Sequence, residues 1–481
     1  MVLHPEWATR HKRKGTELRL LNGHYYLYEV SSKWNPEKKR PQKITGKLLG
    51  KITEEDGFVM SDKDRLRTKE PMISHLSVKE YGVTHFITEI LEQYPKLLQK
   101  HFPLHWQTIM ALAYGRILHQ APLKNMAFHF QHSFLSELYT DTTLSAKELG
   151  WVLRELGNSR SDIVAFFREF SKANDCILFD GTDINSCSEK IGINKNGKSK
   201  KGTYDKLINL MFVFSVGQQL PIYYRITPGN IKDVKSFKLC LKESGVKDAV
   251  IIADKGFYSE NNVNQLYGEG LKFIIPLKRD SLRIDYSKIK QTDKQIFDNY
   301  FKFEDRFIWH YTIQSGQFNT VVYLDPELKT REERDFLDRI ETCPKKFTIE
   351  KFHQKQHTFG TISLLNNLEK TPKEIYEDYK SRDQIELMID TLKNVVEADR
   401  SYMQDEQALE GWMFINYISL HWYYKLFHLL IKNNLNKVYS PADFLKILTE
   451  VRKVKINESW HNAEITRKTA DLIGKIGVHI T

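Results

Sequence analysis

The chain has 481 residues, with 72 Lys and Arg against 61 Asp and Glu, a net charge of +11 and a pI near 9.1. This length allows several domains, and the basic balance favours a polyanionic partner such as nucleic acid. The four cysteines have no paired spacing, which argues against a disulfide framework and indicates a cytoplasmic protein. The first 14 residues are polar and end in the basic run RHKRK, so we expect no secretion signal. The apolar stretches are interrupted by polar residues, so we expect no membrane partner.

The first 60 residues have the pattern of a small β-rich module. Leu18–Leu21 and His24–Val30 flank Asn22-Gly23, a dipeptide that suits the positive φ angles of a hairpin turn. A run of cations follows these strands: Lys38, Lys39, Arg40, Lys43, Lys47 and Lys51. The cations either track a phosphate backbone or solvate an edge strand, and the sequence does not separate the two.

Residues 74–172 have a helical pattern. Helices are predicted near Val78–Gln93, Trp106–His119 and Ala146–Leu156. Ser145 and Glu148 form a capping-box start for the third helix, in which Ser145 accepts a backbone N–H and Glu148 reaches back. Short helices of this kind suit a DNA-binding domain, and they equally suit structural packing, because no recognition-helix pattern is present.

From Cys176 onward, strands and helices alternate. Strands are predicted at Cys176–Asp180, Leu207–Val216, Leu220–Thr227, Ala249–Asp254 and Leu271–Leu277, with helices at Ile231–Glu243 and Glu260–Tyr267. Alternation of this kind predicts an α/β sheet domain, here over residues 173–279 and 361–435. Residues 280–360 are predicted to form a β-rich insertion, with two strands pairing about Ser315-Gly316 and a charged helix near Arg331–Glu341. Residues 436–481 form a C-terminal tail with a short helix near Ala442–Val451.

Two aspartates end predicted strands. Asp180 ends the first apolar strand. Asp254 ends a later strand and begins the sequence Asp-Lys-Gly-Phe. Functional groups gather at the carboxyl ends of strands in open α/β sheets. Each aspartate alone is also explained as a cap on the turn after its strand. Asp183 lies three residues after Asp180, so strand alternation sends it to the opposite face and favours Asp180.

A predicted helix at Tyr379–Lys393 carries a narrow polar stripe at the edge of an apolar face. The stripe contains Tyr379, Arg382, Glu386 and Lys393. It could be a solvated charged face of an amphipathic helix. Asp383 and Asp390 also point near Glu386, so helical geometry alone does not choose the acid.

The pattern Tyr-x2-Arg-x3-Glu-x6-Lys resembles the signature of DDE-class insertion-sequence transposases. Asp180-Gly-Thr and Asp254-Lys-Gly-Phe precede it in the order that this family shows, and the resemblance covers most of residues 176–420. Pro228-Gly229-Asn230-x-x-Asp233 also looks like a family turn, which we interpret as structural. The loop Asn194–Lys206 departs from the family pattern.

The resemblance implies an RNase H-like catalytic domain in a multidomain α/β chain. It further implies that Asp180, Asp254 and Glu386 bind metal and that Tyr379, Arg382 and Lys393 bind DNA. The expected cofactor is Mg²⁺, for which Mn²⁺ can substitute, because paired oxygen-ligated ions assist phosphodiester cleavage. Three clustered carboxylates repel one another, so the site is expected to depend on its ions.

The implied function is cut-and-paste transposition of an insertion sequence in the bacterial nucleoid. The implied partners are double-stranded DNA, both element ends and target, and a second copy of the chain on DNA. No nucleotide-binding loop is present, so no nucleotide cofactor is expected. Two alternatives stay open: a standalone Mg²⁺-dependent endonuclease of the same fold, and a non-catalytic DNA-binding descendant.

Two aromatic stretches each allow two interpretations. Trp309 and Tyr311 share one face of a predicted strand, where they either hold an unpaired base or pack in the core. The helix around Trp412–Tyr424 either supplies a dimer contact or fills the core, and its composition favours the core.

Overall fold

The computed structural model describes residues 4–36, 38–63, 75–172, 176–198, 204–227, 234–246, 250–291 and 293–479. The chain divides into two compact units: Met1–Ser77 with Lys455–Trp460, and Val78–Val454 with His461–Thr481. The predicted turn at residues 228–233 lies outside the described residues. No described helix is long and apolar enough to cross a membrane. All four cysteines are described, and no disulfide joins them.

The first unit contains an antiparallel sheet of consecutive strands, which confirms the predicted hairpin. The elements are α1 (Glu6–Thr9), β1 (Thr16–Leu21), β2 (His24–Asn35), β3 (Arg40–Thr53) and β4 (Gly57–Met60), with the strands paired in chain order. Asn22 and Gly23 have φ angles of 47° and 79°, as a two-residue hairpin turn requires. A small core beneath the sheet contains Ala8, Leu18, Tyr25, Leu27 and Ile52.

The β2–β3 ribbon is longer than the sequence predicts. β2 continues past Val30 to Asn35, and most of the cations expected after the strands lie within β3. Pairing runs from Tyr25 opposite Ile52 out to Asn35 opposite Arg40. Cross-strand pairing stabilises β3 although its composition is poor in β-formers, because its long cationic side chains stay in water.

The second unit begins with short helices. They are α3 (Gly82–His85), a π turn (Phe86–Ile90), α4 (Gln93–His101), α5 (Trp106–His119), α6 (Met126–His132), α7 (Leu135–Leu138), α8 (Ala146–Asn158) and α9 (Arg160–Arg168). The helix predicted at Trp106–His119 is confirmed with the same bounds. The helix predicted from Val78 is wrong at its start, because β5 (Leu76–Glu80) comes first. Ser145 accepts the Glu148 backbone N–H as predicted, but the Glu148 carboxylate accepts the Thr143 hydroxyl instead of reaching back.

Eleven strands of the described chain form one mixed sheet. Its main path is β12 (Asn299–Phe303), β13 (Arg306–Ser315), β14 (Phe318–Leu324), β15 (Thr361–Asn366), β11 (Lys272–Pro276), β10 (Val250–Ile252), β6 (Cys176–Ser186), β8 (Tyr204–Ser215) and β7 (Lys195–Lys198). β9 (Leu220–Thr227) pairs with β8, and β16 (Arg400–Ser401) pairs with β6. The strands of residues 280–360 continue this sheet, because β14 pairs with β15 over Asn319–Leu324.

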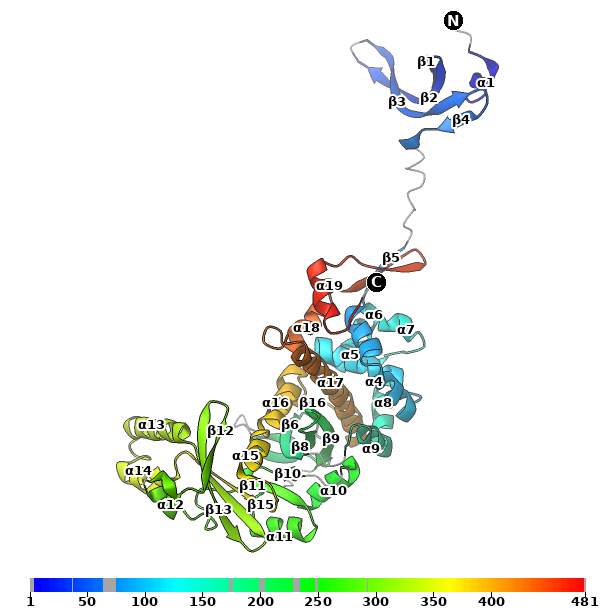
Figure 1. Ribbon diagram of the computed structural model, residues 1–481. Helices are drawn as coiled ribbons and strands as arrows, with labels where there is room; N and C mark the ends of the chain where they lie inside the picture. The colour runs from blue at the N-terminus through cyan, green and yellow to red at the C-terminus, as the bar shows by residue number, and fades with distance from the viewer. Residues whose placement is uncertain are drawn as a thin grey trace. The chain divides into compact units, whose positions relative to one another are not determined.

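Further helices complete the unit. They are α10 (Val234–Ser244), α11 (Glu260–Gly268), α12 (Ser287–Lys290), α13 (Pro326–Thr342), α14 (Ile349–Lys355), α15 (Pro372–Lys380), α16 (Asp383–Asp390), α17 (Glu406–Lys432), α18 (Pro441–Leu448) and α19 (Arg467–Gly474). Of these, α10, α11, α15 and α16 lie close to the strands of this sheet (Figure 1). Two short strands, β17 (Arg452–Ile456) and β18 (Ser459–Asn462), precede α19.

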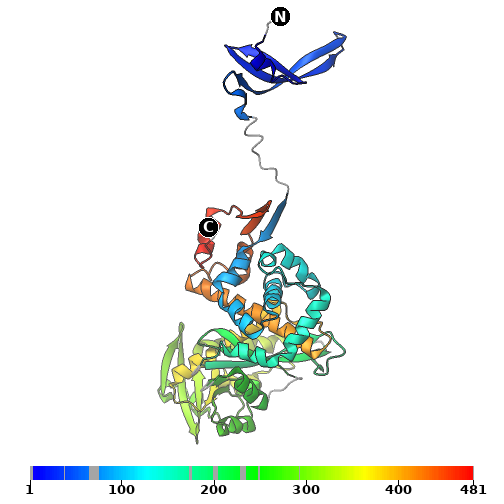
Figure 2. The ribbon, with the colours of Figure 1, turned by 90° about the vertical axis from the view of Figure 1, so that its right-hand side faces the viewer.

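Helix α17 lies in the core, between the early helices and the sheet. It packs against α8, α5 and β9, and the turned view shows the early helices gathered around it (Figure 2). Trp412, Tyr417, Trp422 and Tyr424 are all buried. The core interpretation of this helix is therefore confirmed, and these aromatics do not form a dimer surface.

Two aromatic residues of β13, Tyr311 and Trp309, pack against neighbouring side chains. Tyr311 is buried, and its hydroxyl donates to the Asp285 carbonyl at 2.5 Å. Trp309 is half-buried, with ring centroids 5.9 Å from Phe297 and 5.2 Å from Tyr300. These contacts favour a packing role for Tyr311, whereas a base-holding role for Trp309 stays a prediction.

A half-buried acid, Glu80, lies at the start of the helical layer. The Glu80 carboxylate accepts the Val83 backbone N–H at 2.5 Å and the Tyr114 hydroxyl at 3.0 Å. Burial raises the pKa of Glu80 from its ordinary 4.5 to about 7, although these hydrogen bonds oppose the shift. The folded chain therefore holds a proton on Glu80 at pH values where the unfolded chain has released it.

We expect Glu80 to make the stability of the folded chain fall as pH rises from about 4.5 to about 7. Above pH 7 this contribution is constant, because both states are then ionised. At 1.36 kcal/mol per pKa unit, the loss is at most about 3 kcal/mol. Glu80→Gln stays neutral at every pH, and its single side-chain oxygen can still accept the Val83 backbone N–H, so its melting temperature should lack this part of the pH dependence. If the melting temperatures of the two proteins changed in parallel between pH 4.5 and 7, the assignment would be contradicted.

Candidate active site

Asp180 lies within strand β6. The strand was predicted to end at Asp180, but it continues to Ser186, because β8 pairs with it from Ser215 to Leu207. Asp180 therefore lies opposite Phe212, in the middle of the pairing. Its Oδ1 accepts the Gly181 backbone N–H at 2.8 Å, which orients the carboxylate. The Asp180 side chain is 18% exposed, so a ligand in solution can reach it.

Asp254 comes beside Asp180 through the register of two parallel strands. β10 pairs in parallel with β6, with Ile252 opposite Leu178. Asp254 lies two residues after Ile252, and Asp180 lies two residues after Leu178. The strand was predicted to end at Asp254, but β10 ends at Ile252, so Asp254 lies two residues beyond it, with an extended backbone, just before the short 3₁₀ turn Lys255–Phe257. Parallel register thus explains why two aspartates 74 positions apart in sequence share one place.

Glu386 comes from α16, on a segment that is less regular than predicted. The single helix predicted at Tyr379–Lys393 is divided into α15, a tight turn at Ser381–Arg382, α16 and a π turn at Thr391–Val395. At the first break, the Ser381 hydroxyl donates to the Asp378 carbonyl at 2.5 Å, and Arg382 N–H donates to Tyr379 at i−3. Such side-chain bonds compete with regular helical hydrogen bonds.

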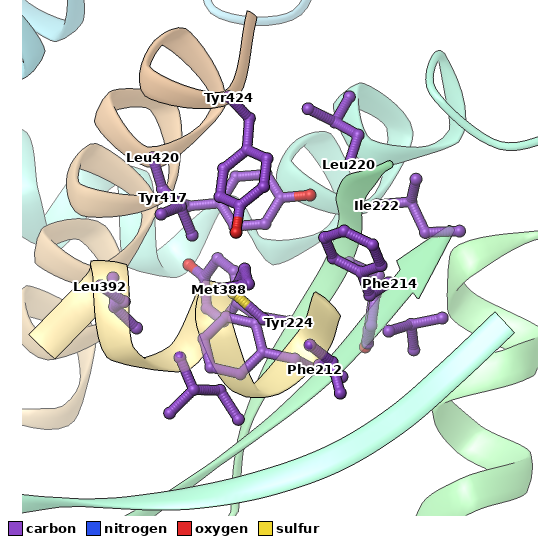
Figure 3. Packing of buried hydrophobic residues seen from close by; sticks show 14 of the residues in the cluster. Phe212, Phe214, Leu220, Ile222, Tyr224, Met388, Leu392, Tyr417, Leu420 and Tyr424 are labelled. Carbon is purple, nitrogen blue, oxygen red and sulfur yellow. The ribbon is translucent and has the colours of Figure 1, made fainter. Parts of the chain in front are cut away.

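The buried face of this segment holds Glu386 over the sheet. Met388 and Leu392 are buried, and Figure 3 shows them among the aromatic side chains of β8, β9 and α17. Arg116 of α5 is buried beside the end of the segment, and its guanidinium donates to the Val396 carbonyl and to Asn416 Oδ1. The core therefore fixes the helix that carries Glu386 relative to the strand that carries Asp180.

The three acids converge on one guanidinium. Arg382 Nη2 lies 3.6 Å from Asp180 Oδ2 and 3.6 Å from Asp254 Oδ1, and Arg382 Nη1 lies 2.9 Å from Glu386 Oε1. The Arg382 side chain is 18% exposed, whereas Glu386 is 54% exposed and lies at the solvent side of the group. The guanidinium offsets the mutual repulsion of three carboxylates, which the sequence predicted only metal ions to relieve.

The donor set fits a hard divalent cation. Among the described residues, no three His, Cys, Asp or Glu side chains lie close enough together to hold an ion as they stand. However, three carboxylates already surround one positive group, and Mg²⁺ and Mn²⁺ prefer carboxylate oxygens. The Arg382 guanidinium thus occupies the position of a cation, and an ion can take that position when this side chain moves away.

Tyr379 lies near these acids, and Lys393 contacts the strand that carries Asp180. Tyr379 is half-buried; burial raises the pKa of its phenol, and nearby Asp254, Asp383 and Glu386 add to the rise while Arg382 opposes it. The phenol is therefore a hydrogen-bond donor at neutral pH. Lys393 Nζ donates to the Asp183 backbone carbonyl at 2.6 Å, which ties the π turn to β6.

Among the described residues, the other candidate acids form no ion pair with Arg382. Asp390 Oδ1 accepts the Asn394 side-chain amide at 2.5 Å, and Asp383 is exposed. Asp183 contributes its carbonyl to Lys393 and lies three residues after Asp180 on the strand. Of the acids weighed from the sequence, only Asp180, Asp254 and Glu386 pair with Arg382 among the described residues.

The central position of Arg382 was missed from the sequence. It was assigned only to DNA, whereas the structure places its guanidinium against all three acids. One signal for this arrangement was available, because Arg382 and Glu386 are spaced i,i+4, a spacing that forms ion pairs on helices. The contacts with Asp180 and Asp254 depend on the tertiary fold.

Comparison with known proteins decides the family. A sequence model described as "Transposase DDE domain" matches residues 171–422, which is more than half of the chain. The chain belongs to the transposase DDE domain family. The matched region begins just before β6 and ends within α17, so it includes Asp180, Asp254 and Glu386. Membership of this transposase family implies nuclease and transesterification chemistry on DNA in general.

The other two comparisons give little further information about this transposase. No curated protein matches the chain. A solved structure described as a piggyBac transposase synaptic complex with hairpin DNA is similar at a TM-score of 0.41 and 12% sequence identity. That match covers 77% of this chain and 75% of the other.

Proposed function

We propose that this protein moves an insertion sequence by cut-and-paste transposition. The observation that carries the proposal is the convergence of Asp180, Asp254 and Glu386 on one cationic position. An acid from β6, one from the end of β10 and one from α16 meet inside the region that matches the family. A merely structural ion pair needs one acid for one arginine, so three acids around Arg382 favour a site built for a larger positive charge.

The strand order supports an RNase H-like core for this site. Strands β9, β8, β6, β10 and β11 are neighbours in that order. β8 is antiparallel to both β9 and β6, whereas β10 is parallel to both β6 and β11. β6 and β10 therefore run in the same direction, which brings Asp180, in the middle of β6, beside Asp254, just beyond the end of β10.

The proposed reaction has two steps at one site. Water attacks the phosphodiester at the element end, the bond to the 3′ oxygen breaks, and a 3′ hydroxyl leaves with the proton. That hydroxyl then attacks a target phosphodiester, so one bond forms as another breaks and no nucleotide is consumed. Mg²⁺ or Mn²⁺ held by Asp180, Asp254 and Glu386 would supply activation of the attacking oxygen and stabilisation of the leaving oxygen.

The residues around the acids are proposed to hold DNA. Arg382 Nε is buried without a hydrogen-bond partner among the described residues, so it can donate to a phosphate oxygen once the side chain turns toward solvent. The Tyr379 phenol can donate to a second oxygen. Double-stranded DNA, both element ends and target, is the proposed partner, with two copies of the chain bringing two ends together. We place this activity in the bacterial nucleoid.

We expect Lys393→Ala to weaken DNA binding and to lower the salt slope of log K by roughly one unit, if Lys393 leaves Asp183 to contact a phosphate. Titrations of an element-end duplex between 50 and 200 mM salt measure this slope. Lys373→Ala, which removes an exposed cation paired with Glu377, is the matched control and should leave the slope unchanged. An unchanged slope in Lys393→Ala would assign this lysine to fastening the π turn onto β6.

The proposal is tested by mapping products. The purified protein is incubated with Mg²⁺ and DNA from the ends of its own coding locus, together with a target plasmid. A transposase yields cleaved ends joined to the target. Cleaved ends with no joined product would favour the standalone endonuclease, and binding without cleavage would favour the non-catalytic descendant.

A further inference from the structure

The outer part of the β2–β3 ribbon is exposed on both faces. Buried residues on β2 end at Leu27, and those on β3 begin at Gly50. β1 pairs with β2 only as far as Glu29, and β4 pairs with β3 only from Gly50. Residues 30–35 and 40–45 therefore form a two-stranded arm, visible in Figure 1 as the ribbon that ends at the β2–β3 turn.

An uncovered two-stranded ribbon gains little from folding alone. Isolated hairpins are marginally stable in water, because they bury too little apolar surface to offset the lost chain entropy. This arm also exposes large apolar groups, since Trp34 is 61% exposed and Ile44 is 45% exposed. The arm is thus better explained by a partner than by the core of its own unit.

The charge of the arm defines that partner. From Val30 to Thr45, the arm with its turn, the sequence has five Lys and Arg residues and one acid, a net excess of four. Residues 1–61 as a whole contain twelve Lys and Arg and seven acids, a net excess of five. Most of the net positive charge of this region therefore lies on the arm and its turn, and its complement is a polyanion.

The two faces of the arm differ. On one face, Lys43 Nζ pairs with Glu17 at 2.5 Å and Thr45 accepts from Arg19, so this face interacts with β1. Cross-strand register puts a different set on the other face: Ser31 with Ile44, Lys33 with Gln42, and Asn35 with Arg40. The second face has no acid, and its Lys, Arg, Asn and Gln side chains suit contacts with base edges and phosphates.

We propose that this arm enters the major groove of double-stranded DNA with the Lys33–Asn35–Arg40–Gln42 face toward the bases. A two-stranded β-ribbon fits this groove, which is about 12 Å wide and 8.5 Å deep. Six residues of strand extend about 20 Å, enough to cross it. The inference rests on the proposed DNA transposase function and assigns its duplex-reading element. Lysines also protect strand edges from aggregation, a role that needs no DNA.

The first test measures binding of the full-length protein to a labelled duplex from its own element end. Lys33→Ala/Arg40→Ala should weaken binding at least tenfold at 0.1 M salt and lower the salt slope by about two. The matched control, Lys96→Ala/Arg331→Ala, removes two exposed cations that pair with Glu92 and Glu327, and it should bind as wild type does. An arm variant with normal affinity and slope overturns the inference.

The second test asks whether the groove is occupied. The wild-type protein should protect guanine N7 atoms of the duplex from dimethyl sulfate, and the arm variant should lose that protection while keeping its melting temperature. N7 atoms that stay reactive under bound wild-type protein would overturn groove entry. Duplex RNA should compete poorly, because its major groove is too deep and narrow for the ribbon. Equal competition by RNA would also overturn the proposal.

The two proposals fail in different ways. If wild-type protein cuts its element ends while the arm variant binds like wild type, only the arm assignment is wrong. If the arm variant loses N7 protection but wild-type protein never cuts with Mg²⁺, the arm assignment survives and the transposase proposal is wrong.

Discussion

Glu386→Gln, Asp180→Asn and Asp254→Asn should each reduce DNA cleavage by about a thousandfold or more. Each substitution removes one of the three carboxylates that surround Arg382. A bound metal contributes several kcal/mol of transition-state stabilisation, and about 4 kcal/mol corresponds to a thousandfold in rate. Single-turnover cleavage of an element-end duplex in Mg²⁺ measures the loss. Binding of that duplex should change little, because its affinity rests on cations.

The matched control for these substitutions is Asp390→Asn. Asp390 lies on the same helix, one turn beyond Glu386, but it pairs with Asn394 and not with Arg382. The variant loses one negative charge, as Glu386→Gln does, and it should cleave DNA normally. If Asp390→Asn were inactive and Glu386→Gln active, the third acid would be assigned to the wrong residue.

Arg382→Gln should tighten binding of Mn²⁺ to the DNA-free protein by about tenfold, or about 1.4 kcal/mol. The guanidinium and the ion compete for the same three carboxylates, so removing the guanidinium removes a competitor. The same variant should bind DNA more weakly, since Arg382 would no longer be available to a phosphate. The electron paramagnetic resonance signal of unbound Mn²⁺ reports metal affinity without requiring activity.

Arg279→Gln is the control for this prediction. Arg279 pairs with Glu332 at 2.8 Å, away from the three acids, so its loss should leave Mn²⁺ affinity unchanged. Unchanged or weaker Mn²⁺ binding in Arg382→Gln would mean that Arg382 and the ion do not share a position. Together the two variants separate local competition from a general change in net charge.

Local patterns in the sequence predicted several elements of the fold. The bounds of α5 and β9 agree with prediction, and the Asn22-Gly23 and Ser315-Gly316 turns lie where expected. Strand signals predicted a strand close before Asp254, although β10 ends two residues earlier than predicted. These features depend on nearby residues, which is why periodicity and turn chemistry reveal them.

Most of the errors have tertiary causes. β6 extends beyond Asp180 because the long apolar strand β8 pairs with it, and β3 forms from a Lys-rich stretch because β2 pairs with it. The Tyr379–Lys393 segment breaks near Ser381 because a side-chain hydrogen bond replaces a regular helical one. The position of Arg382 between acids from three elements requires the register of β6 against β10, which no local pattern encodes.

A crystal of the protein soaked in Mn²⁺ tests the central claim most directly. Anomalous scattering locates Mn²⁺ independently of any activity. The account predicts a peak bonded to carboxylate oxygens of Asp180, Asp254 and Glu386, at the position that the Arg382 guanidinium now holds, with that side chain displaced. No peak among these three carboxylates, at a Mn²⁺ concentration that supports DNA cleavage in solution, would contradict it.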